Sequence, residues 1–221
     1  GSRKHLLASL DHSLKRLRLN HVDIFYSHCP DPHTRLEETM SALATAISSG
    51  KATYVGLSKY PLKTLKKAVK ILKEIGVRCL IYQPPYSILD RAVESAGILD
   101  WLHEEGVGCI AFSPLAQGML TDRYLQGIPA DARAGKPHGY LRPEQLDAVR
   151  MEKVRRLAEV AAERGQPLAS MAIAWVLRDR RVTSAIIGAS KVAQLEQCVA
   201  AASSAPFASD ELKRIDAILA G

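Results

Sequence analysis

Short runs of β-branched and apolar residues alternate with longer amphipathic segments along the whole chain of 221 residues. These runs are bounded by Gly, Pro, Asp or Ser, which is typical of strands buried on both faces. Strands that alternate with helices through right-handed crossovers form a parallel sheet. The predicted strands are Val22–Ser27, Thr53–Leu57, Cys79–Gln83, Gly108–Phe112 and Ser184–Ile187.

The amphipathic segments have the 3.6-residue period of helices. They predict helices over Arg3–Leu17, Leu36–Ser48, Leu62–Glu74, Val93–Glu105, Glu144–Glu163, Ala169–Arg178, Val192–Ala202 and Ser209–Leu219. Pro61, Pro167 and Ser209 lie where helices are expected to begin. The result is five βα units behind a leading helix. An open doubly wound sheet of five strands is compatible with this count, and a closed barrel would need three more strands.

The composition favours one globular domain over residues 1–221, because 47% of the residues are hydrophobic and can form one sizeable core. The sequence has no apolar run of about eighteen residues, which argues against a membrane span. Its charged opening does not resemble a signal peptide. The four cysteines form no Cys-x-x-Cys pair, so we expect neither a zinc site nor a disulfide framework. A cytoplasmic location follows as an expectation.

The formal net charge of +7 is compatible with nucleic acid, an acidic surface or a phosphate-bearing ligand. The basic residues are dispersed at helical spacing between apolar ones, however, which indicates solvated helix faces. Nucleic-acid binding has little support, since the chain has three Phe residues and no basic stripe interleaved with aromatic residues.

Residues just past the carboxyl ends of parallel strands usually form the binding site. Here they are polar, small or cationic: His28, Ser58, Lys59, Gln83, Ser113 to Gly118, and Gly188 to Lys191. They include no group of His, Cys and carboxylates suited to a metal, and we expect none. Ser and Gln side chains can hydrogen-bond a carboxamide, and a Gly-Ala-Ser turn at a helix start presents N–H groups to phosphate. Arg123, Arg133 and Lys191 can supply a cationic clamp.

Each of these features also has a purely structural interpretation. On this interpretation His28 is a hydrogen-bonded residue at a strand end, Ser113-Pro114 is a turn, and Gly188-Ala189-Ser190 is a helix cap. The Gly-x-Gly-x-x-Gly fingerprint and the Gly-x-Ser-x-Gly elbow are absent from the sequence. The residues alone therefore predict a phosphate-bearing ligand at one end of a parallel sheet.

Five segments, in order, resemble the fourth to eighth strand regions of the aldo-keto reductases: SLKRLRLNHVDIFYSH, SSGKATYVGLS, IYQPPYSIL, AFSPLAQGMLTDRY and VTSAIIGASKVAQLE. The resemblance runs from Leu10 to the C-terminus. It implies a (β/α)8 TIM barrel of which residues 1–221 form the C-terminal two-thirds, with strands 1–3 absent from this sequence. Within the family, SPLAQGMLT and IIGAS are most similar to microbial L-glyceraldehyde 3-phosphate reductases and then to potassium-channel β subunits.

The resemblance implies a role for each candidate residue. His28 would orient or polarise the substrate carbonyl as the catalytic residue. The remaining residues would bind the cofactor NADPH. Its nicotinamide would be bound by Ser58, Lys59, Gln83 and Phe112, and its adenosine end by Gly188, Ser190, Lys191 and Gln194. The residues along its pyrophosphate would be Ser113, Pro114, Leu115, Ala116, Gly118, Arg123 and Arg133. The family's general-acid Tyr and its Lys and Asp partners correspond to no residue of this sequence.

The resemblance implies reduction of a small aldehyde or ketone by hydride transfer from NADPH, with a glyceraldehyde-phosphate-like compound as one substrate type. It also implies a homo-oligomer. Two alternatives remain open: an NADPH-binding regulatory subunit with little turnover, and a truncated, inactive barrel fragment. Such a fragment would expose two sheet edges, and we expect it to be unstable alone.

Overall fold

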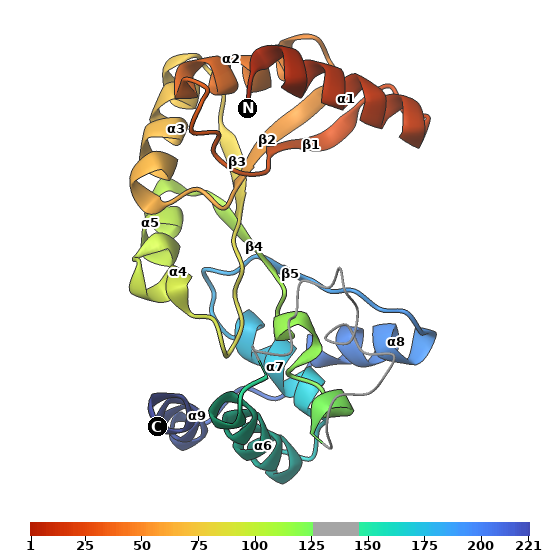
Figure 1. Cartoon of the computed structure of the whole chain (residues 1–221), viewed down its shortest axis with the longest axis vertical. Coiled ribbons are helices and arrows are strands. Elements are labelled where there is room, and N and C mark those ends of the chain that lie inside the picture. Colours follow the sequence, from red (N-terminus) through yellow and green to blue (C-terminus); the bar gives the residue numbers. More distant parts are fainter. Residues whose placement is uncertain (126–145) are drawn as a thin grey trace. The chain divides into compact units, whose positions relative to one another are not determined.

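The computed structural model describes residues 1–125 and 146–221 (Figure 1). Within them lie the five predicted strands: β1 (Val22–Ser27), β2 (Ala52–Ser58), β3 (Cys79–Gln83), β4 (Gly108–Phe112) and β5 (Ser184–Ile186). The strands follow chain order in one sheet, and the pairs β1–β2, β2–β3 and β3–β4 are parallel. The prediction of a parallel α/β sheet is therefore confirmed.

The helices are α1 (Arg3–Leu17), α2 (Leu36–Ser48), α3 (Leu62–Glu74), α4 (Ala92–Ser95), α5 (Ile98–Glu105), α6 (Ala148–Glu163), α7 (Leu168–Leu177), α8 (Val192–Ala201) and α9 (Ser209–Ala220). Two short 3-10 turns, η1 (Ala116–Gly118) and η2 (Asp122–Tyr124), follow β4. Pro61 and Pro167 cap α3 and α7, as expected near helix starts. None of the helices in the described part of the chain is long and apolar enough to cross a membrane.

The prediction of one helix over Val93–Glu105 is wrong. The structure divides this segment into α4 and α5 at Gly97, whose φ of 67° is left-handed. A residue without Cβ adopts that conformation at little cost, and it ends one helix and begins another. The amide of Gly97 donates to the carbonyl of Glu94 at 2.9 Å.

The chain forms two compact units, of which the first comprises Gly1–Pro84 and Val93–Ile110. In this unit α1 and α2 pack along β1 and β2 (Figure 1). One of its apolar clusters consists of Leu10, Leu14, Ala46 and Ala52, against which Val22 and Phe25 pack. The burial of these side chains holds α1 and α2 against the strands.

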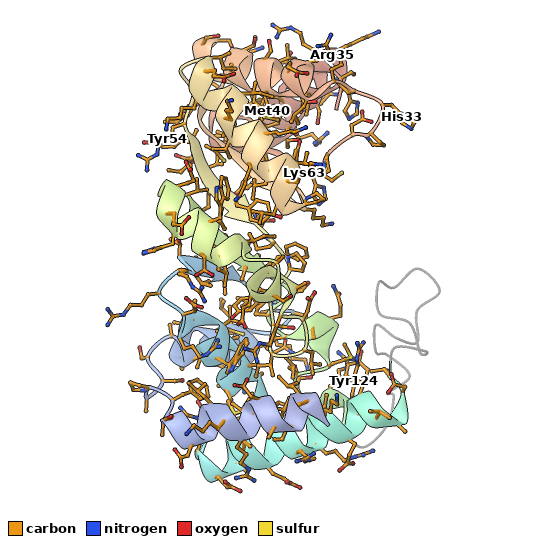
Figure 2. The ribbon with its side chains drawn as sticks, turned by 90° about the vertical axis from the view of Figure 1, so that its left-hand side faces the viewer. His33, Arg35, Met40, Tyr54, Lys63 and Tyr124 are labelled. Atoms are coloured by element: carbon orange, nitrogen blue, oxygen red, sulfur yellow. The ribbon has the colours of Figure 1, made fainter. Side chains whose placement is uncertain are left out.

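The second unit comprises Pro85–Ala92 and Ala111–Gly221. Its apolar cluster joins α7 and α8 to the chain after β4 and β5, and consists of Ile173, Cys198 and Ala201 with Leu115, Leu177 and Ile187. Helices α6 and α9 lie side by side in both views (Figures 1 and 2). The guanidinium of Arg164 binds the carboxylate of Glu211 at 2.5 Å, and Arg214 pairs with Glu163.

Candidate active site

In the first unit, the strand ends bring together residues that are far apart in sequence. Ser27 of β1 is in register with Leu57 of β2. The residues that follow this pair are His28, directly after β1, and Ser58, the last residue of β2. His28 is exposed, whereas Ser58 is 2% exposed. A polar ring and a buried hydroxyl thus lie at the carboxyl ends of adjacent parallel strands.

Ser58 and Gln83 are in direct contact. They are in register across β2 and β3, and the Ser58 hydroxyl donates to the Gln83 carbonyl oxygen at 2.6 Å. The structure thus brings together Ser58 and Gln83, the two residues predicted from the sequence to bind a carboxamide. Lys59, the next residue, is exposed and has a φ of 58°, so the chain turns sharply as it leaves β2.

A buried hydrogen-bonded network lies beneath these strand ends. The hydroxyl groups of Ser27 and Tyr60 lie 2.8 Å apart, and the Tyr82 hydroxyl donates to the Tyr60 carbonyl oxygen at 2.8 Å. Burial raises the pKa of Tyr60, and it raises the pKa of Tyr82 to about 12. Both phenols are therefore neutral near pH 7 and act as hydrogen-bonding groups that hold the strand ends in place.

In the second unit, the chain after β4 forms a tight turn with unusual backbone angles. Phe112 ends β4, and its carbonyl oxygen accepts from the Tyr86 amide at 3.2 Å. Left-handed φ values occur at Ser113 (56°), Ala116 (46°) and Gln117 (62°). For residues with a Cβ, such angles cost free energy and occur preferentially at functional sites.

Hydrogen bonds within this turn hold its conformation. The Ala116 amide donates to the Ser113 carbonyl oxygen at 2.9 Å, and the Gln117 side-chain amide donates to the Ser113 hydroxyl at 3.2 Å. Pro114 and Leu115 lie inside the turn, and the amide of Gly118 donates to the Leu115 carbonyl at 2.9 Å. Ser113-Pro114 is thus part of a turn, and the amides of Ala116 and Gly118 are used in hydrogen bonds inside it.

Arg123 lies in η2, where its backbone amide donates to the Thr121 hydroxyl at 3.3 Å. Its side chain is exposed, whereas the neighbouring Tyr124, labelled in Figure 2, is 3% exposed. Tyr124 packs within 3.5 Å of the position that a Cβ on Gly118 would take. Arg133, which was predicted to bind the pyrophosphate together with Arg123, lies outside the described residues.

The start of α8 combines exposed residues with a local hydrogen bond. Lys191 is the residue that caps this helix, so the expectation that Gly188-Ala189-Ser190 forms the cap is off by one residue. The side-chain oxygen of Gln194 accepts from the Ser190 amide at 2.9 Å and lies 3.2 Å from its hydroxyl. Gly188, Ser190, Lys191 and Gln194 are exposed. An exposed helix N-terminus with a lysine suits an anion.

The sequence did not single out Tyr60 and Tyr82, two residues whose hydroxyl groups make buried hydrogen bonds at these strand ends. Their contacts depend on the register between strands, and the chain carries other tyrosines with no distinguishing local pattern. Gln117 lies in the predicted binding segment Ser113 to Gly118, and its side chain hydrogen-bonds Ser113, but no role was predicted for it.

A comparison with protein families matches residues 1–220 to the aldo/keto reductase family. The L-glyceraldehyde 3-phosphate reductases of Escherichia coli O157:H7 and of strain K12 are 51% identical over 219 residues. That alignment covers 98% of this chain, which spans 63% of the length of these relatives. A probable voltage-gated potassium channel subunit β of Oryza sativa subsp. japonica is 35% identical over 222 residues, covering 99% of this chain and 68% of the relative.

Among solved structures, the thermostable aldo-keto reductase Tm1743, crystallised with the inhibitor epalrestat, matches with a TM-score of 0.76 and 27% identity. The match covers 98% of this chain and 67% of that one. The chain has parallel strands in chain order, with polar residues at their carboxyl ends. Both features agree with the family match, which covers almost the whole sequence. The chain belongs to the aldo/keto reductase family.

Proposed function

We propose that this protein reduces a small aldehyde or ketone to an alcohol with NADPH as the hydride donor. The observation that carries the proposal is the contact between Ser58 and Gln83 at the ends of β2 and β3, beside His28 at the end of β1. Two groups that can hydrogen-bond a carboxamide thus lie next to one that can hydrogen-bond a carbonyl oxygen. The identity of 51% to reductases of a phosphorylated aldehyde supports the same reaction class.

The residues present suit NADPH by their chemistry. Ser58, Lys59 and Gln83 would take the nicotinamide carboxamide, with Phe112 stacking on the ring. The turn Ser113–Gly118 would line the pyrophosphate, and the cations of Arg123 and Arg133 would bind it. Gly188, Ser190, Lys191 and Gln194 would bind the adenosine end, where the charge of Lys191 favours a 2′-phosphate and hence NADPH over NADH.

When bound, NADPH would supply a hydride to the carbonyl carbon. His28 would hydrogen-bond the carbonyl oxygen, which would take the proton that completes the alcohol from solvent water. Its ring would donate a hydrogen bond to that oxygen, which favours the pose for reduction and stabilises the charge that develops there. Ser27, the preceding residue, is anchored to Tyr60, so the backbone that carries His28 has a fixed position. An exposed ring on a fixed backbone is suited to meeting a substrate from solvent.

The test is an assay of NADPH oxidation with L-glyceraldehyde 3-phosphate, with unphosphorylated glyceraldehyde and with a long-chain aldehyde. We expect turnover with the short aldehydes, and a higher kcat/KM for NADPH than for NADH. Turnover of the phosphorylated compound above that of glyceraldehyde would support a glyceraldehyde-phosphate-like substrate. Absence of turnover with every carbonyl would contradict the proposal.

A second function is favoured by the 35% identity to potassium channel β subunits. On that alternative, the protein binds NADPH tightly, turns over little and regulates a partner protein. Tight NADPH binding together with negligible carbonyl reduction would favour it. We place it second because the reductases are more similar, at 51%.

We further propose that residues 1–221 belong to one domain with the (β/α)8 architecture, that the protein works in the cytoplasm, and that it forms a homo-oligomer. The match to a solved aldo-keto reductase supports the first point. The four free thiols, of which three are buried, suit a reducing compartment.

A further inference from the structure

Tyr60 connects the carboxyl ends of three neighbouring strands. It lies in the turn after β2, and it is 1% exposed. Its hydroxyl lies 2.8 Å from the hydroxyl of Ser27, the last residue of β1. Its carbonyl oxygen accepts from the hydroxyl of Tyr82 on β3 at 2.8 Å. The turn after β2 is thus bound by one side chain from each of the two strands that flank β2.

Both hydrogen bonds are buried, which makes them costly to break. Ser27, Tyr60 and Tyr82 are each at most 2% exposed. A buried hydroxyl that loses its partner has no water to replace it, so the loss carries the desolvation penalty of that group. Burial also raises the pKa of Tyr60, so its hydroxyl keeps its proton near pH 7. Ser27 therefore has a fixed partner across the strand ends.

His28 directly follows Ser27 and is exposed. Because the peptide unit between the two residues is planar and rigid, the position of Ser27 limits where the Cα of His28 can lie. A group that acts on a reacting atom depends on such limits, since a displacement of about 1 Å can lower a rate by about a hundredfold. The contact between Ser27 and Tyr60 thus bears on where the His28 ring is presented.

We infer that Tyr60 is a positioning residue for His28: its hydroxyl holds Ser27 and so fixes the backbone from which the His28 ring meets the substrate carbonyl. Tyr82 holds the backbone of Tyr60 in turn. This inference rests on the proposed function, in which His28 hydrogen-bonds that carbonyl.

Tyr60→Phe tests the inference, because it removes the hydroxyl and keeps the ring. In steady-state kinetics with NADPH and glyceraldehyde, we expect kcat to fall about three- to tenfold, the usual effect of one hydrogen bond. NADPH binding, measured by fluorescence titration, should stay within about twofold, since Tyr60 is assigned to the substrate side. Tyr54→Phe is the matched control, because Tyr54 lies on β2 and is 46% exposed, and it should leave both values unchanged (Figure 2).

Combination with His28→Ala separates positioning from a general loss of structure. If Tyr60 acts through His28, Tyr60→Phe should lower kcat no further in a protein that already lacks the imidazole. A structural defect would lower kcat by the same factor in both backgrounds, and that result would overturn the inference.

A second readout needs neither cofactor nor turnover. We expect the backbone order parameter of His28, measured by nuclear magnetic relaxation, to be about 0.85 in the unmodified protein and lower in Tyr60→Phe. The amide of His33 is the internal control, because it donates to the Asp31 carboxylate at 2.9 Å and should keep its value. An unchanged order parameter at His28 would contradict the role of Tyr60.

The outcomes separate this inference from the function beneath it. If the unmodified protein reduces no carbonyl compound, the proposed function fails, and the order parameters still decide whether Tyr60 fixes the backbone of His28. If it does reduce them and Tyr60→Phe changes neither kcat nor the order parameter, the function stands and the role of Tyr60 is overturned. A lowered order parameter with unchanged kcat would also overturn it, because the movement would then have no effect on catalysis.

Discussion

The hydroxyl groups of Ser27 and Tyr60 lie 2.8 Å apart, in a buried hydrogen bond between the end of β1 and the turn after β2. Ser27 directly precedes His28, and Tyr60 follows Lys59. This one contact therefore ties together the backbones that carry the proposed catalytic residue and part of the proposed nicotinamide site.

Removing one partner of this hydrogen bond should destabilise the protein. Both side chains are at most 2% exposed, so Tyr60→Phe leaves the Ser27 hydroxyl buried without that partner. We expect the free energy of unfolding, measured in urea, to fall by about 1–2 kcal/mol. The double variant Ser27→Ala/Tyr60→Phe should lose less than the sum of the two single variants. Additive losses would mean that the hydrogen bond contributes nothing.

His28→Ala should lower kcat for carbonyl reduction by roughly a hundredfold, as loss of a hydrogen-bonding group at the reacting oxygen does. NADPH affinity should be unchanged, because His28 is assigned to the substrate and not to the cofactor. His33→Ala is the matched control, since His33 is an exposed histidine of the same connection between β1 and α2 (Figure 2). Steady-state kinetics of both variants decide the point, and unchanged turnover in His28→Ala would remove His28 from the mechanism.

Lys191→Ala should weaken NADPH by roughly tenfold or more, the range for a hydrogen bond to a charged group. NADH lacks the 2′-phosphate, so its affinity should change by less than about twofold. The measurement is the ratio of the two dissociation constants at fixed ionic strength. Lys63→Ala, an exposed lysine on α3, serves as the control (Figure 2). Equal effects of Lys191→Ala on both cofactors would place Lys191 away from the 2′-phosphate.

Cys79 should make the stability depend on pH in the alkaline range. Burial raises the pKa of its thiol from 9.0 to about 11, and the residue is 1% exposed. Between these values the unfolded thiol ionises while the folded one stays protonated. Its contribution is therefore complete below pH 9 and is lost as the pH rises towards 11.

The unmodified protein should accordingly lose about 2 kcal/mol more stability than Cys79→Ala between pH 9 and pH 11. Cys29→Ala, at an exposed thiol, should follow the unmodified protein across the same range. Parallel stability curves for Cys79→Ala and the unmodified protein would show that the thiol ionises alike in both states.

The strands and most helices were predictable from local pattern. Val22–Ser27, Cys79–Gln83 and Gly108–Phe112 match β1, β3 and β4 because these apolar runs end at clear Gly, Pro or polar residues. The break between α4 and α5 was not predicted. The apolar period continues across Gly97, and only the left-handed angle of that residue shows that the helix ends there.

The polar residues at the strand ends could likewise be predicted, because position after a strand is a property of the sequence. Their supports could not. Tyr60 hydrogen-bonds Ser27 from the turn after β2, and Tyr82 of β3 hydrogen-bonds the Tyr60 carbonyl oxygen, so both contacts require the register between strands. The sequence correctly predicted that α8 begins at Val192, but it placed the helix cap at Ser190, one residue before Lys191. The hydrogen bond between Ser190 and Gln194 depends on where this helix begins.

The most direct test of the proposed reaction is its stoichiometry. The purified protein is incubated with NADPH and glyceraldehyde, and the NADP⁺ and the alcohol formed are quantified in the same samples. We predict equimolar formation of the two products over many turnovers, abolished when the carbonyl compound is omitted. Tight NADPH binding with no alcohol formed would contradict the proposal and favour the regulatory subunit instead.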